Sequence, residues 1–383
     1  MRTSRWFNRN GSNRNQRHLM KTKILRKILL NVGVFLALTW VLIAGPNDGI
    51  LDVGDTPLCH SHPTFITFDP PGGSAEDILP SGINPMGTII GTYLIGSFPN
   101  VVFHAFLREP NGTFTTIDPP GSSGAEIASG YPGSQPINPA GAITGGYSDA
   151  SGVNHGFLRA PSGTFTSFDP PGSTFTIPES INPAGAITGF DFDATGANHA
   201  FLRAADGTFT MFDAPDGVGG TIGQGINSAG SVVGSYFDAN FVTHGFVRGP
   251  DGTITEFDVP DAVYGTQPSG INAAGAVTGF YYDVNVVTHG FLRAKDGTFT
   301  TFDPLGSTET FVGGINPSGV MTGYYFTANS VDSFVRTPDG TIIAPLDVPG
   351  SSNTFASVIN PMGTITGNYF DASGVIHGFV RIP

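Results

Sequence analysis

Histidine, arginine and aspartate recur at fixed positions along most of this chain. A histidine begins each short H-G-F-L-R segment, an arginine ends it, and an aspartate follows about ten residues later in an F-D dipeptide. The histidines are His104, His155, His199, His244, His289 and His377, with Asp332 once in their place. The arginines are Arg108, Arg159, Arg203, Arg248, Arg293, Arg336 and Arg381. The aspartates are Asp69, Asp118, Asp169, Asp213, Asp258, Asp303 and Asp347. Side chains of these types could form a ring of ligands or an anion-binding circle.

The same residues belong to a repeat of about 45 residues that occurs seven times between Phe65 and Arg381. Each copy also contains a G-I-N-P-A-G-A-I-T-G element. Its asparagines are Asn84, Asn138, Asn182, Asn227, Asn272, Asn316 and Asn360. Residues present in every copy are those that a scaffold needs. A unique activity would therefore have to lie where the copies differ.

Each unit contains four short β-like segments separated by tight-turn sequences. In the third unit the segments are Thr176–Asn182, Ala186–Asp193, His199–Ala204 and Thr208–Asp213. They are joined by N-P-A-G, D-A-T-G and D-G, which are typical turn compositions. Four antiparallel strands per unit form a propeller blade. The composition agrees, since the chain has 54 Gly and 30 Pro and no long helical periodicity after residue 50.

The spacings predict the order of the strands within a blade. Two connections have nearly constant length in all units: the one from I-N to I-T-G and the one from H-G-F-L-R to F-D. The connection from F-D to the next I-N instead varies from about 12 to about 19 residues. The most variable connection should cross between blades. We therefore predict an all-β, seven-bladed propeller of four-stranded antiparallel blades. In each blade the I-N strand (A) is innermost, A-I-T-G-x-Y (B) and H-G-F-L-R (C) follow, and the F-D strand (D) is outermost.

This order leaves half a blade at each end of the repeat. The array begins with a D strand, Thr64–Asp69, and ends with a C strand, Ile376–Arg381. A closed ring pairs these two strands, whereas an open solenoid, which is the alternative, leaves both as exposed edges. We expect closure.

The strand order also changes the interpretation of the repeated polar residues. Strand C is third from the axis, so its histidines and arginines cannot converge on one ion. We expect them instead to satisfy backbone carbonyls and the F-D aspartate within each blade, because buried polar groups are usually paired. The D-A-[NST]-G segments at Asp149, Asp193 and Asp371 lack the further ligands of a calcium loop and are predicted hairpin turns. No hydrolase, phosphate-binding or zinc motif is present, and we expect no catalytic residue, metal or cofactor.

Charge and hydropathy predict export. Nine of the 17 Lys and Arg residues lie between Arg2 and Lys27, all 30 Asp and Glu lie beyond residue 45, and the chain beyond residue 45 carries a net charge of about −22. Such a charge argues against nucleic-acid binding. The basic cluster precedes an apolar run, Ile28–Ala44, which we interpret as a signal peptide cleaved near Ala44, with an uncleaved anchor as the alternative. Met20 is an alternative start.

The domain organisation follows from these boundaries. Residues 1–45 are leader and signal or anchor, 46–63 a linker, and 64–383 the propeller. The linker holds the only cysteine, Cys59, beside His60 and His62. These three side chains are a weak metal pattern, and a flexible linker is favoured.

The repeat resembles the bacterial extracellular repeats of the HAF family, named for a His-Ala-Phe element. That element occurs at His104-Ala105-Phe106 and His199-Ala200-Phe201, and as H-G-F in four other units, while the sixth unit has Asp332-Ser333-Phe334. The resemblance covers nearly all of residues 64–383. It implies an exported protein and provides no catalytic residues to transfer.

The variable loops are the expected working surface. The A–B and C–D turns share one face and are nearly identical in every unit, whereas the D–A and B–C loops on the other face differ, above all Gly72–Leu79, Gly121–Pro136 and Asp261–Pro268. The longest of these loops is alternatively a tolerated insertion. Candidate binding residues are Glu76, Asp77, Glu126, Tyr131, Gln135, Asp261 and Tyr264.

These features favour an interaction role over an enzyme. We expect an exported monomer, extracellular or on the cell surface with the periplasm as an alternative, that binds a glycan, a peptide or a surface protein. We expect no nucleic-acid partner, and membrane contact only through an uncleaved N-terminal segment. The alternatives are a propeller-type polysaccharide lyase or glycosidase, which would need a pair of suitably spaced carboxylates, and a purely structural surface protein.

Overall fold

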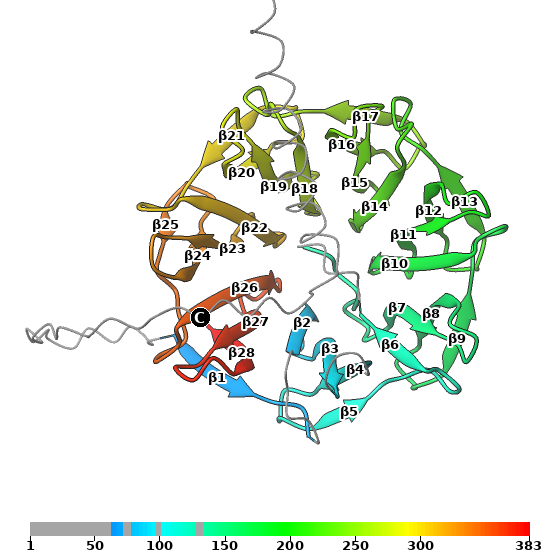
Figure 1. The fold of residues 1–383 in the computed structure, drawn as a ribbon, viewed down its shortest axis with the longest axis horizontal. Coiled ribbons are helices and arrows are strands. Elements are labelled where there is room, and N and C mark those ends of the chain that lie inside the picture. Colours follow the sequence, from blue (N-terminus) through cyan, green and yellow to red (C-terminus); the bar gives the residue numbers. More distant parts are fainter. Residues whose placement is uncertain (1–62, 72–77, 97–100, 128–132) are drawn as a thin grey trace, which may run out of the picture. The chain divides into compact units, whose positions relative to one another are not determined.

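Seven four-stranded antiparallel sheets form a ring of blades in the computed structural model (Figure 1). The structure describes residues 63–71, 78–96, 101–127 and 133–383. Thr64–Ile382 form one compact unit, and its described part contains only strands, turns and loops. The predicted fold class is therefore confirmed. None of the described residues belongs to a helix with the length and hydropathy to cross a membrane.

Six blades are built from consecutive strands, which follow one another in the order A to D. Blade 1 is β2 (Ile78–Ile83), β3 (Ile89–Ile95), β4 (Val102–Arg108) and β5 (Phe114–Thr116). Blade 2 is β6 (Gly124–Glu126), β7 (Ile143–Ser148), β8 (Asn154–Arg159) and β9 (Phe165–Phe168). Blade 3 is β10 (Phe175–Ile181), β11 (Ile187–Phe192), β12 (Asn198–Arg203) and β13 (Phe209–Phe212).

The remaining blades have the same plan. Blade 4 is β14 (Thr221–Ile226), β15 (Val232–Phe237), β16 (Thr243–Arg248) and β17 (Ile254–Phe257). Blade 5 is β18 (Thr266–Ile271), β19 (Val277–Tyr282), β20 (Thr288–Arg293) and β21 (Phe299–Phe302). Blade 6 is β22 (Glu309–Ile315), β23 (Met321–Phe326), β24 (Val331–Arg336) and β25 (Ile342–Ile343). Blade 7 is β26 (Asn353–Ile359), β27 (Ile365–Phe370), β28 (Ile376–Ile382) and β1 (Thr64–Phe68).

The predicted strand order is confirmed. Strands such as β10, β14 and β18 lie nearest the centre of the ring, and D strands such as β13 and β17 lie at its rim (Figure 1). The ring is closed as expected, because β1 pairs with β28 from Thr64↔Ile382 to Phe68↔Gly378.

The asparagine of the I-N element fixes the following turn in every blade and links its blade to the next in five of them. Its Oδ1 accepts backbone N–H groups of the following turn, as Asn182 does from Ala186 N at 2.9 Å. Its Nδ2 donates to the carbonyl oxygen of the asparagine in the next blade. These bonds join Asn138 to Asn182, Asn182 to Asn227, Asn227 to Asn272, Asn316 to Asn360, and Asn360 to Asn84 at 3.0–3.4 Å. The asparagine therefore fixes both the A–B turn and the contact between neighbouring blades.

Packing within the blades rests on the phenylalanine of strand C and the glycine of I-T-G. Phe201 is fully buried, and a Cβ on Gly189 would lie 2.9 Å from the Phe201 ring and 2.1 Å from the carbonyl oxygen of Ile177. Only glycine fits there. Burying each such ring contributes on the order of 1.5–3 kcal/mol, so apolar packing between blades is a sufficient source of stability.

Candidate functional site

The propeller has two different faces. The A–B and C–D turns form one, which we call the turn face. The B–C and D–A loops form the other, which we call the loop face. Antiparallel connections alternate between the two ends of a sheet, so residues at the start of strand C and at the end of strand D belong to the loop face.

A histidine–aspartate pair occupies the loop-face end of six blades. The His Nδ1 atom lies 2.6–2.9 Å from a carboxylate oxygen of the F-D aspartate. The pairs are His104–Asp118, His155–Asp169, His199–Asp213, His244–Asp258, His289–Asp303 and His377–Asp69. The expectation that each histidine satisfies the F-D aspartate of its blade is confirmed.

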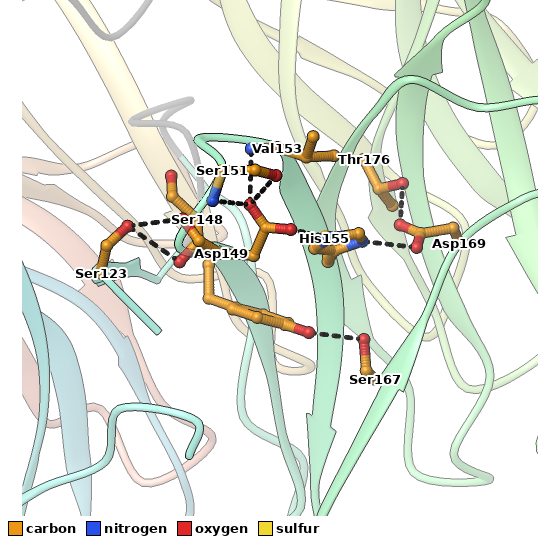
Figure 2. A network of polar contacts seen from close by, with 10 residues as sticks. Ser123, Ser148, Asp149, Ser151, Val153, His155, Ser167, Asp169 and Thr176 are labelled. Carbon is orange, nitrogen blue, oxygen red and sulfur yellow. Dashed lines mark hydrogen bonds and ion pairs between the residues drawn. The ribbon is translucent and has the colours of Figure 1, made fainter. Parts of the chain in front are cut away.

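Figure 2 shows this network in blade 2. One carboxylate oxygen of Asp169 is hydrogen-bonded to Nδ1 of His155 at 2.7 Å, and the other accepts from the Thr176 hydroxyl at 2.6 Å. Thr176 belongs to the next blade, so this bond crosses between blades. Asp149, in the B–C turn, lies on the other side of the His155 imidazole, with its Oδ2 3.5 Å from Nε2. The hydrogen bond from the Ser151 hydroxyl, with further bonds from backbone N–H groups, lowers the pKa of Asp149 to about 2. The bond to Asp169 raises the pKa of His155.

This arrangement is poorly suited to proton transfer. In five blades the second imidazole nitrogen also faces an aspartate, at 3.5–3.8 Å. Nδ1 is therefore engaged by the F-D carboxylate, and Nε2, the other nitrogen that could act as a general base, faces a second carboxylate. In five of the six blades a tyrosine of strand B also lies against the imidazole, with ring centroids 5.1–5.4 Å apart. The network therefore ties the B–C turn, strand C and strand D together.

Two blades depart from this pattern. In blade 6, Asp332 replaces the histidine, and burial, with the charge of Asp332 as a lesser cause, raises the pKa of Asp347 to about 6. In blade 3, Asp191 replaces the tyrosine of strand B. Asp191 is only 2% exposed, its Oδ1 has no hydrogen-bond partner, and burial raises its pKa. Sequence reasoning identified the first departure and missed the second, although the signal was a single aspartate in place of the I-T-G-x-Y tyrosine.

The arginines are not partners of the F-D aspartates. In five blades the guanidinium lies 4.9 Å from the centroid of a strand D phenylalanine in the preceding blade, as Arg203 does over Phe168. Arg159 instead lies 5.9 Å from Phe165 of its own blade, because the preceding D strand has Ile117 at that position. The expected Arg–Asp pairing is therefore wrong among the described residues, whereas the expected bond to a backbone carbonyl is confirmed for Arg108, Arg203 and Arg248. In five blades the arginine joins neighbouring blades through a cation–π contact.

The end of the longest loop enters the middle of the ring. Gly133 lies against blades 5 and 6, since a Cβ there would be 2.5 Å from the carbonyl oxygen of Ser269 and 3.0 Å from that of Gly313. The Ser134 hydroxyl donates to the carboxylate of Glu179 in blade 3 at 2.9 Å, and both residues are buried. This segment therefore lies between inner strands on different sides of the ring, where a surface loop was expected.

The predicted binding residues fall in several places. Glu76, Asp77 and Tyr131 lie outside the described residues. Glu126 is half-buried at the end of β6, and burial raises the pKa of its carboxyl to about 7.

The other three predicted residues lie in two loops. Gln135 belongs to the segment inside the ring, where its N–H donates to the Ser180 hydroxyl at 2.8 Å. Asp261 is exposed in the loop that enters blade 5, and Tyr264 of the same loop packs on the cluster around Phe280. Among the described residues, no group of three or more His, Cys, Asp or Glu side chains could hold a metal ion.

The most exposed apolar side chains of the loop face lie in blades 4, 5 and 6, whereas those of the other blades, such as Phe103 and Val375, are 37–44% exposed. Each of these blades carries one exposed apolar residue in its D–A loop and another in or next to its B–C loop. They are Val218 (74% exposed) and Phe241 (67%) in blade 4, Val263 (51%) and Val284 (60%) in blade 5, and Leu305 (101%) and Phe326 (36%) in blade 6. We call these six residues the apolar patch. Sequence reasoning missed it, although it lies where the turns depart from the repeat.

The comparisons with known structures show the fold. A virginiamycin B lyase from Staphylococcus aureus is 13% identical, with a TM-score of 0.53, over 84% of this chain and 100% of the lyase. A streptogramin B lyase is 13% identical, with a TM-score of 0.53, over 84% of this chain and 98% of its own. The β-propeller domain of the Trilobed protease from Pyrococcus furiosus is 9% identical, with a TM-score of 0.54, over 79% of this chain and 95% of the domain.

The last of these is described as having an open velcro topology, whereas β1 and β28 pair in this chain. No family model matches the sequence, and no curated protein matches it. Identities this low establish a common propeller architecture and no common activity.

Proposed function

We propose that this protein is an exported interaction scaffold that binds its ligand, a glycan, a peptide or a surface protein, through the loop face. The basic leader and the apolar run Ile28–Ala44 support export, and so does the resemblance of the repeat to the HAF family. Both the fold and the resemblance are compatible with a binding role and supply no catalytic group.

One observation carries the proposal. Phe241 has φ +60° at a turn position where three other blades have glycine, and its side chain remains 67% exposed. A bulky residue in this backbone region costs about 1–2 kcal/mol. The fold recovers little of that cost by burying the ring. Strain of this kind is typically retained at ligand-binding sites, so a bound ligand is the natural partner of the exposed ring.

The proposal is tested with defined ligands. The full chain is screened against arrays of cell-wall and plant polysaccharides and of peptides, and each hit is measured again with Phe241→Gly and with Tyr131→Ala plus Glu126→Ala. The matched control is Met86→Ala, which removes an exposed apolar side chain from a turn-face loop and restores the repeat sequence. We expect Phe241→Gly and the double change Tyr131→Ala plus Glu126→Ala to weaken binding at least about tenfold, or about 1.4 kcal/mol. A ligand weakened only by the control change would place the working surface on the other face.

An extracellular glycosidase or lyase is the second candidate function. Glu126 favours it, because a carboxyl with a pKa of about 7 is suited to general acid catalysis near neutral pH. A glycosidase also needs a second carboxylate within roughly 5–10 Å. The buried carboxylate of Glu179 already accepts a hydrogen bond from Ser134 inside the ring. Polysaccharide cleavage that Glu126→Gln abolishes, in a chain that still folds, would favour the enzyme.

A further inference from the structure

We infer that the apolar patch binds a partner protein through a segment that combines Lys or Arg with apolar side chains. This inference rests on the proposed function and specifies the class of ligand and the blades that bind it. It excludes a neutral glycan as the ligand at this place.

The patch residues are held next to one another in pairs by backbone hydrogen bonds. In blade 4, Gly219 N donates to Phe237 O at 2.9 Å, which brings the loop of Val218 beside the turn of Phe241. In blade 5, Val263 N donates to Tyr282 O at 3.0 Å, at the start of the turn that carries Val284. In blade 6, Thr308 N donates to Phe326 O at 2.7 Å, three residues after Leu305.

The same pairing of a D–A loop with a B–C turn recurs on the loop face of three successive blades, whose inner strands β14, β18 and β22 are neighbours in the ring (Figure 1).

The backbone under the patch departs from the repeat in two blades. The B–C turns of blades 2, 3 and 7 have glycine at the left-handed position, with φ of 83–84°. Blades 4 and 5 have Phe241 at φ 60° and Val286 at φ 63° instead. Val286 packs against the cluster around Phe280, so its apolar contacts offset the cost of its strained backbone. Phe241 is exposed, so burial within the described fold offsets little of the cost of its backbone.

The charge around the patch has one sign. All eight Lys and Arg residues beyond Lys27 end strand C or lie in a C–D turn, at the turn face, so the loops that carry the patch contain none. The same loops carry aspartates, of which Asp216 and Asp261 are exposed. Apolar side chains surrounded by negative charge complement a basic and apolar segment, and they repel an acidic one. Neutral sugars would gain nothing from this charge.

The probes are three synthetic peptides of equal length, one of Lys and Leu, one of Glu and Leu, and one of Lys and Ser. Binding to the full chain is measured by fluorescence anisotropy at about 50 and about 300 mM salt, which separates screened charge attraction from apolar contact. Phe241→Gly and Leu305→Pro remove patch residues and restore the repeat sequence. Met86→Ala with Met362→Ala does the same at the turn face and is the matched control. A cooperative thermal transition at or above the melting temperature of the parent confirms that each variant folds.

We expect the Lys–Leu peptide to bind at least tenfold more tightly than the other two, and the patch variants to remove most of that difference. The control variant should bind as the parent does. Equal binding of the Lys–Ser peptide would mean unspecific charge attraction and would overturn the inference, as would Lys–Leu binding that the patch variants leave intact. A polysaccharide whose binding depends on Phe241 would preserve the proposed function and overturn this inference. The absence of any loop-face ligand in both screens would overturn the two together.

Discussion

At the scale of single residues, the positions that break the repeat are more informative than those that keep it. Six His–Asp pairs stabilise the loop-face ends of their blades, and in blade 6 Asp332 leaves Asp347 without a histidine. The carboxyl of Asp347 is partly buried and its charged form is disfavoured, so its pKa rises to about 6. Because Asp332 stands where the other blades have histidine, blade 6 lacks a stabilising pair and its stability depends on the protonation of Asp347.

The free energy of unfolding should depend on pH through Asp347. With a pKa of about 6 in the folded chain and about 3.9 when unfolded, the folded state holds more protons between these values. The contribution of this group to stability is therefore complete below about pH 4 and is lost as the pH rises to about 6. Urea unfolding at several pH values should show this loss.

Asp332→His tests the cause. A histidine there should pair with Asp347, lower its pKa and stabilise the fold at neutral pH by about 1 kcal/mol, after allowance for solvent screening. Asp347→Asn is the control that removes the titration. If the parent and Asp347→Asn lose stability equally between about pH 4 and pH 6, another group is responsible.

At the scale of elements, strand C connects each blade to the one before it. Its phenylalanine fills the blade, while its arginine reaches back over a D-strand ring of the preceding blade, as Arg203 does over Phe168 at 4.9 Å. A planar guanidinium over an aromatic face is attracted by the ring quadrupole and keeps its alkyl stem in apolar surroundings. The repeated arginine is thus a contact between elements.

Arg203→Ala should lower the free energy of unfolding by roughly 1–3 kcal/mol, through the lost ring contact and the lost burial of the stem. A double-mutant cycle with Phe168→Leu should give a coupling of about 0.5–2 kcal/mol. The matched cycle is Arg159→Ala with Ile117→Val, where the preceding blade has Ile117 in place of the D-strand phenylalanine, and it should give almost none. Equal coupling in the two cycles would contradict the cation–π account. Binding by the folded fraction should not change.

At the scale of the whole molecule, closure of the ring depends on five residues far from their partners in sequence. Thr64–Phe68 pair with β28, and Asp69 accepts from Nδ1 of His377 at 2.9 Å. Without β1 the last blade would present a long strand edge, which is a template for association with other chains. The segment Gly133–Gln135 adds contacts between inner strands across the ring.

Deleting Thr64–Asp69 from the full chain should cause aggregation or a large drop in melting temperature, because it exposes the edge of β28 and removes a histidine partner. The control deletes a segment of the same length, residues 46–51, which precedes the propeller in the sequence. Light scattering and calorimetry compare the two. A monomeric deletion variant that melts with the parent would show that closure contributes little.

The sequence by itself determined the number of blades, the order of their strands and the closure of the ring. Each of these follows from local turn chemistry and from regular spacing along the chain, which a repeat states seven times. It also determined the His–Asp pairing, because strands C and D are sequence neighbours joined by a short turn. The export signal, the ligand and the candidate residues Glu76, Asp77 and Tyr131 stay predictions.

Only the tertiary structure decided which contacts cross between blades. The stacking of Arg203 on Phe168, the entry of Gly133 into the ring and the burial of Asp191 all depend on surfaces that meet after closure. The apolar patch likewise needs the ring, because Val218, Val263 and Leu305 are about 45 residues apart and come to one face of neighbouring blades only when successive blades pack. The repeat determines the strands and turns of each blade, whereas packing between blades determines which side chains share the surface that could bind a ligand.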